Sequence, residues 1–327
     1  MRRVMAVGLS FLLAITACSS KPTAAPPARS AHSSTGGAEL PAAGEVVRRV
    51  PVMHQPDGLS ATPTSLWVGS YGSAAIAQID TRTGALARTV QLSGTPIPLS
   101  VHADSTGVWA AAYGASAVLR IDPVTGRPDA TIPVGSGPNG FAEVAGQLWV
   151  VNHYDSTISV INPGTRKVVR TIAVDGLQGG FPVAYGGAVW VADLEGSSNQ
   201  LWRIDPASGR VTAKIPAGPN PAEVAFGFGS GWVTDREGLT RFDPASGAVQ
   251  KRFTNLGHHL FGIALTTDSV WVGSIGDNQL VRIDPQRGEV TGRVADIKGP
   301  RQIATVDGQL WVAEFGGNTV AQIKPAN

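Results

Sequence analysis

Hydrophobic and polar positions repeat along this chain with a period of about 40 residues. The clearest marker is a tryptophan that follows a small or apolar residue and usually precedes valine. It occurs at seven positions: Trp67, Trp109, Trp149, Trp190, Trp232, Trp271 and Trp311. Successive copies lie 39 to 42 residues apart, and only Trp202 falls outside the series. A fixed period of this length is typical of repeat architectures.

Within each period the pattern predicts short strands. About 12 residues after most of the tryptophans comes Ile-Asp-Pro or a close variant, often followed by a Thr-Gly or Ser-Gly turn and then an alternating strand. Residues 121–126 and 168–172 are examples of the turn and of the strand. No part of the repeat has helical periodicity. We therefore expect about four strands in each unit, which is the signature of a β-propeller blade.

The two ends of the repeat region complement each other. After Trp311 the chain ends just past a third strand, whereas residues 45–52 match a fourth strand and precede the first blade. Pairing these two segments would close the ring and remove both free sheet edges. Residues 45–327 are thus predicted to form an all-β, seven-bladed β-propeller with 3+1 closure, in which the N-terminal strand completes the last blade.

Composition and charge narrow the functional classes. Only 15% of residues are charged, and 40 Gly and 23 Pro accompany them, which excludes a helical bundle or coiled coil. Arg2 and Arg3 precede the predicted globular region, and the remaining 24 basic residues balance 24 acidic ones. Without a basic surface the chain is not expected to bind nucleic acid.

Residues 1–17 have the proportions of a signal peptide, with a cationic start and a short apolar run. The run ends Ile-Thr-Ala-Cys at Cys18, which resembles the lipobox of bacterial lipoproteins. That resemblance implies a diacylglyceryl thioether on Cys18, cleavage before it, and further acylation, for example with palmitate. The alternative is an ordinary signal peptide with an incidental cysteine. Cys18 is the only cysteine, so no disulfide within the chain is possible.

Residues 18–44 are interpreted as the lipidated cysteine followed by a disordered tether. They are rich in Ala, Pro, Ser, Thr and Gly and contain almost no large apolar side chains. The expected location is the outer face of a bacterial cytoplasmic membrane, to which the N-terminal lipid attaches the chain. The propeller is expected to be a monomer.

Functional residues are expected where the repeats differ. A tryptophan present in every blade is interpreted as a wedge between blades. In propellers two sets of loops surround one mouth of the central channel, and two rings of variable positions fall there. The first ring, three residues after each tryptophan, comprises Ser70, Ala112, Asn152, Asp193, Asp235, Ser274 and Glu314. The second ring comprises Asp57, Ile97, Asn139, Phe181, Ala222, Phe261 and Arg301.

These rings and their neighbours predict a pocket with aromatic walls and a few polar groups, as small-molecule sites have. The candidate ligand-binding residues are Tyr71, Tyr113, Asn139, His153, Phe181, Asp193, Phe261 and Arg301. The partner would be a small molecule or an extracytoplasmic protein or peptide, including fragments of cell wall. The alternative is that such residues only solvate the mouth. His102 lies away from both rings and is interpreted as a structural or surface histidine.

The Trp-Val repeat with Ile-Asp-Pro-x-Ser/Thr-Gly resembles the Vgb/YncE-like (YVTN-type) seven-bladed propellers, and distantly the virginiamycin B lyase group. The resemblance to that group implies a Mg²⁺-dependent lyase or hydrolase of a cyclic ester or lactone-like substrate. Its candidate catalytic residues here are Glu314, Asp235, His258 and His259. No metal ligand is assigned otherwise, and no cofactor is predicted apart from Mg²⁺ under this alternative. A non-enzymatic ligand-binding or interaction scaffold is the favoured interpretation.

Overall fold

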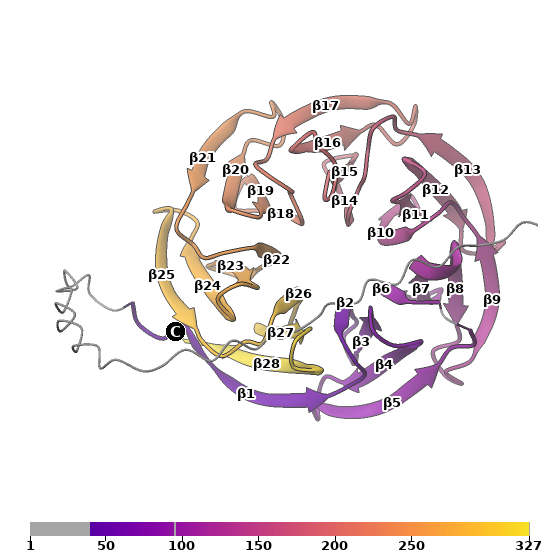
Figure 1. The fold of residues 1–327 in the computed structure, drawn as a ribbon, viewed down its shortest axis with the longest axis horizontal. Helices are drawn as coiled ribbons and strands as arrows, with labels where there is room; N and C mark the ends of the chain where they lie inside the picture. The colour runs from indigo at the N-terminus through magenta and orange to yellow at the C-terminus, as the bar shows by residue number, and fades with distance from the viewer. Residues whose placement is uncertain (1–39, 95, 327) are drawn as a thin grey trace, which may run out of the picture. The chain divides into compact units, whose positions relative to one another are not determined.

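A computed structural model describes residues 40–94 and 96–326, and all structural statements below refer to them. Apart from one 3₁₀ turn, η1 (Tyr113–Ala115), every regular element there is a β-strand. The strands form seven four-stranded antiparallel sheets around a central axis (Figure 1). This confirms the predicted seven-bladed propeller. The predicted signal peptide, Cys18 and most of the predicted tether lie outside the described residues.

Each blade begins with its innermost strand and ends with its outermost one. Blades 1 to 3 consist of β2 (Pro56–Ala61), β3 (Ser65–Ser70), β4 (Ala75–Asp80), β5 (Ala85–Gln91); β6 (Pro98–Asp104), β7 (Gly107–Ala112), β8 (Ala117–Ile121), β9 (Pro128–Pro133); β10 (Pro138–Val144), β11 (Gln147–Asn152), β12 (Thr157–Asn162) and β13 (Lys167–Ala173). Blades 4 and 5 consist of β14 (Pro182–Tyr185), β15 (Ala188–Ala192), β16 (Gln200–Ile204), β17 (Val211–Pro216); β18 (Val224–Gly227), β19 (Ser230–Asp235), β20 (Gly238–Phe242) and β21 (Val249–Phe253). Blades 6 and 7 consist of β22 (Leu260–Leu265), β23 (Val270–Ser274), β24 (Gln279–Asp284), β25 (Glu289–Val294); β26 (Pro300–Val306), β27 (Gln309–Glu314), β28 (Thr319–Pro325) and β1 (Gly44–Pro51). Within the described residues, no helix is both long and apolar enough to span a bilayer.

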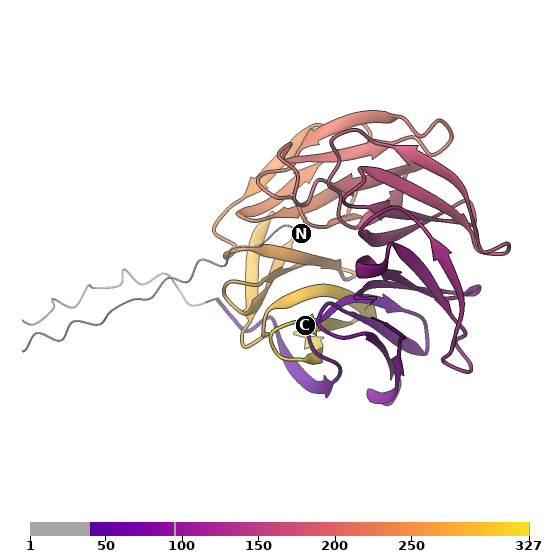
Figure 2. The same ribbon diagram turned by 45° about the vertical axis from the view of Figure 1, so that its right-hand side comes forward.

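The seventh blade combines the two ends of the described chain. β1 pairs antiparallel with β28, with Val46 opposite Ile323 and Val50 opposite Val320. Figures 1 and 2 both show the indigo β1 beside the yellow C-terminal strands. This pairing is consistent with the predicted 3+1 closure, because the N-terminal strand is the fourth strand of the last blade.

The propeller contacts begin slightly before the predicted boundary at residue 45. Ala42 forms a bridge with Arg293 of β25, and Ala43 is buried. The segment before β1 can approach β25 this closely because residue 292 is glycine. A Cβ at Gly292 would lie 2.6 Å from the Pro41 carbonyl oxygen. The last residues assigned to the tether therefore pack on the neighbouring blade, because small side chains and one glycine let the two backbones meet.

The seven repeated tryptophans pack between blades, as predicted. Each is at most 2% exposed and lies in an apolar cluster with the next blade along the chain. Trp67, for example, packs with Val108 and Ile121 of blade 2. Trp311 of blade 7 packs with Leu66 and Ile79 of blade 1. The same contact therefore continues across the junction where the ring closes.

Most of these tryptophans also carry a cation on one face. In four blades this cation is the arginine that precedes Ile-Asp-Pro or Phe-Asp-Pro, which stands opposite the tryptophan on the adjacent strand, as Arg120 does to Trp109. Over Trp67 it is Arg88 of β5. The guanidinium carbon lies 5.9 Å from the ring centroid there and 5.1 Å in the pair Arg241–Trp232. Cation–π contacts of this kind contribute about 0.5–1 kcal/mol at exposed sites. This second repeated role was not predicted from the sequence.

The repeated aspartates cap turns. The Asp122 carboxylate accepts hydrogen bonds from the backbone N–H groups of Val124 and Thr125, and Gly126 takes a φ of 70°. These N–H donors lower the pKa of the Asp122 carboxyl below its ordinary value. The carboxylates therefore have local partners in the turn, as the Asp-Pro-x-Ser/Thr-Gly pattern indicates.

We predict that Trp311→Ala destabilises the propeller by about 3–5 kcal/mol, because it leaves a cavity between blades 7 and 1. Urea denaturation followed by near-UV circular dichroism measures the loss. Val124→Ala, at a side chain that is 83% exposed, is the control and should change the free energy of unfolding very little. A loss below about 1 kcal/mol for Trp311→Ala would contradict the wedge role.

Candidate ligand-binding site

A cavity of about 540 Å³ lies at one mouth of the channel, and we call it the mouth cavity. All seven blades contribute to its lining. The lining residues are Asp57, Tyr71, Leu99, Tyr113, Asn139, His153, Tyr154, Phe181, Leu194, Glu195, Asn220, Ala222, Arg236, His259, Leu260, Phe261, Arg301 and Phe315. The volume lies within the range of small-molecule sites, about 300–1,000 Å³.

The innermost strands deliver the deeper residues of the cavity. Asp57, Asn139, Phe261 and Arg301 are each the second residue of such a strand, in β2, β10, β22 and β26. In blade 2 the equivalent position is Leu99 rather than the expected Ile97, which does not line the cavity. The remaining members of the second ring, Phe181 and Ala222, precede their strands and line it as well.

Aromatic side chains form much of the wall. They come from the loops that follow the tryptophan strands: Tyr71 lies near Phe315, with ring centroids 6.1 Å apart. The hydroxyls of Tyr113 and Tyr154 are 2.7 Å apart and hydrogen-bonded. Burial and this hydrogen bond raise the pKa of Tyr113, so it stays neutral. His153 packs edge-on to Tyr154 at 4.9 Å.

The floor of the cavity is apolar. Phe181 and Phe261 meet edge to face with centroids 5.8 Å apart, and Ala222 completes their buried cluster. Because both rings are at most 6% exposed, they form a fixed surface rather than a mobile rim.

Arg301 is the main hydrogen-bond donor near the apolar floor of the mouth cavity. Its guanidinium lies between two phenyl rings, 4.6 Å from the centroid of Phe261 and 4.7 Å from that of Phe315. The nearest carboxylate oxygen, Oδ2 of Asp57, is 3.7 Å from Nε, beyond hydrogen-bond distance. Nε itself has no hydrogen-bond partner among residues 40–94 and 96–326. The two rings therefore hold a planar donor group whose hydrogen-bonding capacity is not used at Nε.

Two buried carboxyl groups lie close to Arg301. Burial raises the pKa of Asp57 to about 6, although the Arg301 guanidinium opposes the shift. Burial raises the pKa of Glu223 further, to about 8, despite a backbone hydrogen bond that it accepts from Ile263. Glu223 was missed by the sequence analysis. A signal was present, since an acidic residue stands in the apolar run Pro-Ala-Glu-Val at the start of an innermost strand.

The first ring does not line the cavity. All of its seven members are 0% exposed, and the polar ones bond to neighbouring strands or to nearby loops. Asp193 accepts hydrogen bonds from the backbone N–H groups of Gln178 and Ser198. Of the eight candidate ligand-binding residues, Asp193 is thus the one outside the cavity lining, and the other seven line it together. Four of its members bond to loops near the mouth: Ser70, Asp193, Ser274 and Glu314.

The candidate catalytic residues do not converge. Glu314 pairs with Arg49 at 3.0 Å and also accepts hydrogen bonds from Lys298 and Thr319. The Asp235 carboxylate pairs with Arg252. The side chain of His258 is 86% exposed and pairs with Asp277.

Only His259 of that set lines the mouth cavity, and burial together with Arg301 and Arg236 lowers its pKa. The described residues place no group of three His, Asp or Glu ligand atoms at this cavity. The donor set expected for Mg²⁺ therefore does not fit, because the two carboxylates are already neutralised by arginines.

Fold and cavity together describe a seven-bladed β-propeller with an aromatic-walled cavity at one mouth of its channel. The sequence matches no protein-family model and no curated protein. Among solved structures it is similar to an inactive variant of virginiamycin B lyase from Staphylococcus aureus with quinupristin: 17% identity, TM-score 0.73, covering 85% of this chain and 98% of that one.

Two further structures share the fold. Hydrazine synthase from Kuenenia stuttgartiensis has 16% identity and a TM-score of 0.72, covering 90% of this chain and 98% of that chain. BamB from Moraxella catarrhalis has 17% identity and a TM-score of 0.59, covering 82% and 83%. At these identities the likeness concerns the architecture, which unrelated activities share.

The raised pKa of Glu223 predicts a pH-dependent stability. Between the ordinary pKa of 4.5 and the folded-state value of about 8, the folded chain holds a proton that the unfolded chain releases. The free energy of unfolding therefore falls as pH rises through this window. Glu223→Gln removes the fall, so its Tm should exceed that of the wild type by roughly 5 °C more at pH 8 than at pH 5.

Differential scanning calorimetry at both pH values measures this effect. The exposed Glu289→Gln variant is the control and should follow the wild type. A Tm difference between Glu223→Gln and the wild type that does not change with pH would show that Glu223 is ionised in the folded state.

Proposed function

We propose that this chain is an extracytoplasmic, lipid-anchored binding protein that captures a small ligand in the mouth cavity. The observation that carries the proposal is the Arg301 guanidinium held between Phe261 and Phe315 inside a cavity lined by seven blades. The buried Nε of Arg301 has no hydrogen-bond partner among the described residues, which is unfavourable unless a ligand or water satisfies it.

The lining indicates the chemistry of the ligand. Arg301 suits a carboxylate or carbonyl oxygen, which planar guanidinium groups bind well. The cavity also contains the carboxyl groups of Asp57 and Glu195 and a second guanidinium from Arg236, so its formal charges nearly balance. Together with the aromatic wall, this favours an amphipathic ligand without large net charge. A small peptide or depsipeptide with an aromatic side chain and an accessible carbonyl or carboxylate fits these features.

Binding is favoured over catalysis. A lyase would need a base and a metal next to the reacting bond. Glu314 and Asp235 already pair with arginines and lie outside the cavity lining, and the described residues bring no three ligand atoms together beside His259. We therefore expect a ligand such as quinupristin, present in the similar lyase structure, to remain chemically unchanged if it binds.

The binding hypothesis predicts that Arg301→Met abolishes or weakens ligand binding by about tenfold or more, because it removes a charge-assisted hydrogen bond worth about 1.5–3 kcal/mol. Isothermal titration calorimetry on the full chain measures this with quinupristin and a panel of short aromatic peptides. Arg82→Met, at an exposed side chain outside the cavity, is the control.

Two outcomes would contradict the proposal: no member of the panel binds, or the ligands that bind do so equally well to Arg301→Met. Chromatography of the recovered quinupristin in the presence of Mg²⁺ tests the lyase alternative. Elimination would open the ring of quinupristin without changing its mass. The product must therefore be separated from intact quinupristin by chromatography, because mass alone does not distinguish them.

The proposed location depends on residues 1–44. With Cys18 lipidated after removal of residues 1–17, acyl chains would hold the protein to the outer face of the cytoplasmic membrane. Residues up to about 40 would then separate the propeller from the lipid surface.

We predict that Cys18→Ser moves the protein from the membrane fraction to the soluble exported fraction and abolishes incorporation of a labelled palmitate analogue. Fractionation of a bacterial host and immunoblotting measure both effects. Ser19→Ala is the matched control and should remain in the membrane fraction. Unchanged membrane association of Cys18→Ser would show that lipid does not anchor the chain.

A further inference from the structure

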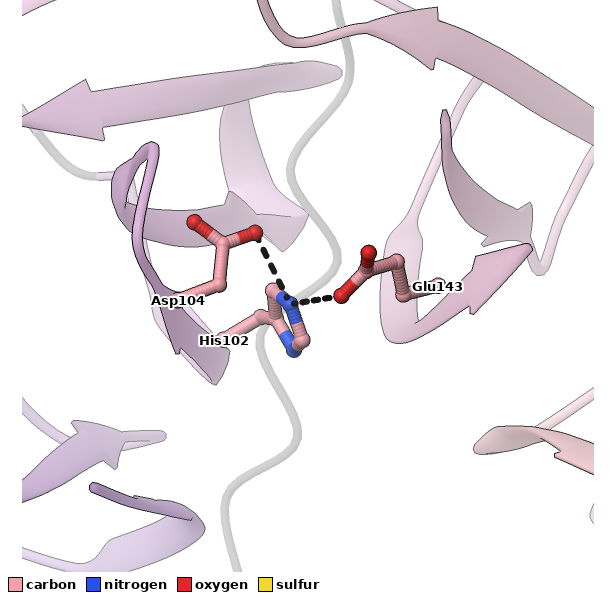
Figure 3. A group of neighbouring side chains, drawn as sticks. All are labelled: His102, Asp104 and Glu143. Atoms are coloured by element: carbon pink, nitrogen blue, oxygen red, sulfur yellow. Dashed lines mark ion pairs between the residues drawn. The ribbon is translucent and has the colours of Figure 1, made fainter. Parts of the chain in front are cut away.

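A second group of polar side chains lies on the innermost strands away from the mouth cavity. His102 and Asp104 come from β6, and Glu143 comes from β10 of the next blade (Figure 3). Nε2 of His102 is 3.3 Å from Oδ2 of Asp104 and 4.0 Å from Oε2 of Glu143. The three ligand atoms all lie within 4.8 Å of one another.

Strand geometry separates this cluster from the mouth cavity. Leu99 and Asn139, near the starts of β6 and β10, line the mouth cavity, whereas the cluster lies towards the other ends of these strands. A strand advances about 3.3 Å per residue, so Asp104 is about 16 Å from Leu99 along β6. His102 and Asp104 are two residues apart and therefore share one face of the strand.

The local hydrogen bonds orient the Asp104 carboxylate for a ligand. Its Oδ1 accepts hydrogen bonds from the backbone N–H groups of Thr106 and Gly107 at 2.6 and 3.1 Å and from the Thr106 hydroxyl at 2.5 Å. The other oxygen, Oδ2, faces the His102 ring. Fixing one carboxylate oxygen while the other stays available is a common arrangement around metal ligands.

The imidazole in this cluster lacks a hydrogen-bond partner. Nε2 of His102 is buried, and none of the described residues forms a hydrogen bond with it. Buried polar atoms are normally satisfied, and a nitrogen without a hydrogen-bond partner that lies beside two carboxylate oxygens is well placed to bind a cation.

We propose that His102, Asp104 and Glu143 bind one divalent transition-metal ion, for which Zn²⁺ is the best match. Imidazole and carboxylate are both zinc ligands, with bond lengths of about 2.0–2.2 Å. Ligand atoms around a tetrahedral ion at that distance lie roughly 3.3–3.5 Å apart. The 3.3 Å separation fits already, and the 4.0 Å one closes by a small movement of Glu143, whose side chain is 52% exposed.

Three protein ligands leave at least one coordination position for water or another ligand, as in zinc sites that exchange ligands. His102 also lines a second cavity of about 250 Å³, which we call the channel cavity, together with Phe141 and Gln302. A ligand in the channel cavity with a carboxylate or other anionic oxygen is therefore the class that such an ion would recruit.

Titration of the metal-free full chain tests the site. Calorimetry with Zn²⁺ and absorption spectroscopy with Co²⁺ should give one saturable equivalent per chain and visible Co²⁺ bands of a low-coordinate nitrogen and oxygen site. His102→Gln should weaken binding by roughly 100-fold. Glu143→Gln, at an exposed side chain, should weaken binding without affecting folding, which circular dichroism checks.

The matched control is His258→Gln. His258 forms another histidine–carboxylate pair, with Asp277 at 2.9 Å, but belongs to no group of three ligands among the described residues. The control should bind the metal like the wild type. The proposal is overturned if the wild type takes up neither ion saturably, or if binding survives both His102→Gln and Glu143→Gln unchanged.

Discussion

Burial of one tryptophan of each blade against the next blade is the constraint on which the whole structure depends. A single four-stranded sheet leaves apolar surface uncovered on both faces, so each blade needs two neighbours. Trp311 provides this contact across the junction by packing on Leu66 and Ile79 of the first blade. The pairing of β1 with β28 adds a backbone connection at the last blade. The channel, and every residue positioned around it, exists only because this series of contacts closes.

At the channel mouth, two adjacent positions in the repeat have different roles: the residue three positions after each repeated tryptophan, and the residues that follow it. The residue three positions after each repeated tryptophan is buried, and several of these residues bond to a nearby loop, as Glu314 does by accepting a hydrogen bond from the backbone N–H of Lys298. The residues that follow, such as Tyr71 and Phe315, extend into the mouth cavity. Buried polar groups thus support several of the loops, while aromatic groups form the wall of the mouth cavity. Replacing a support residue is expected to affect stability first and ligand binding only indirectly.

The repeat made the fold predictable, because features shared by every blade are visible in one sequence. The tryptophan period, the Asp-Pro turns and the match between residues 45–52 and the last blade all come from such features. The residues that line the cavity were harder to predict than the fold. At the end of a strand, a shift of one residue decides whether a side chain is buried beneath a loop or lines the cavity. Asp193 was misplaced for that reason. Glu223 bonds to Ile263 of another blade, and Glu143 of the next blade lies beside His102; spacing along one chain does not reveal such neighbours.

The two cavities are adjacent but chemically distinct. Phe181 lines both and forms the apolar floor of the mouth cavity with Phe261. Asp57 lies on the mouth side and Glu223 on the channel side, and the charge of Asp57 contributes to raising the pKa of Glu223. A ligand group that binds Arg301 would compete for the cation that offsets the charge of Asp57. Since low-dielectric surroundings strengthen such interactions, an anionic group bound to Arg301 would raise the proton affinity of Glu223, which lines the channel cavity.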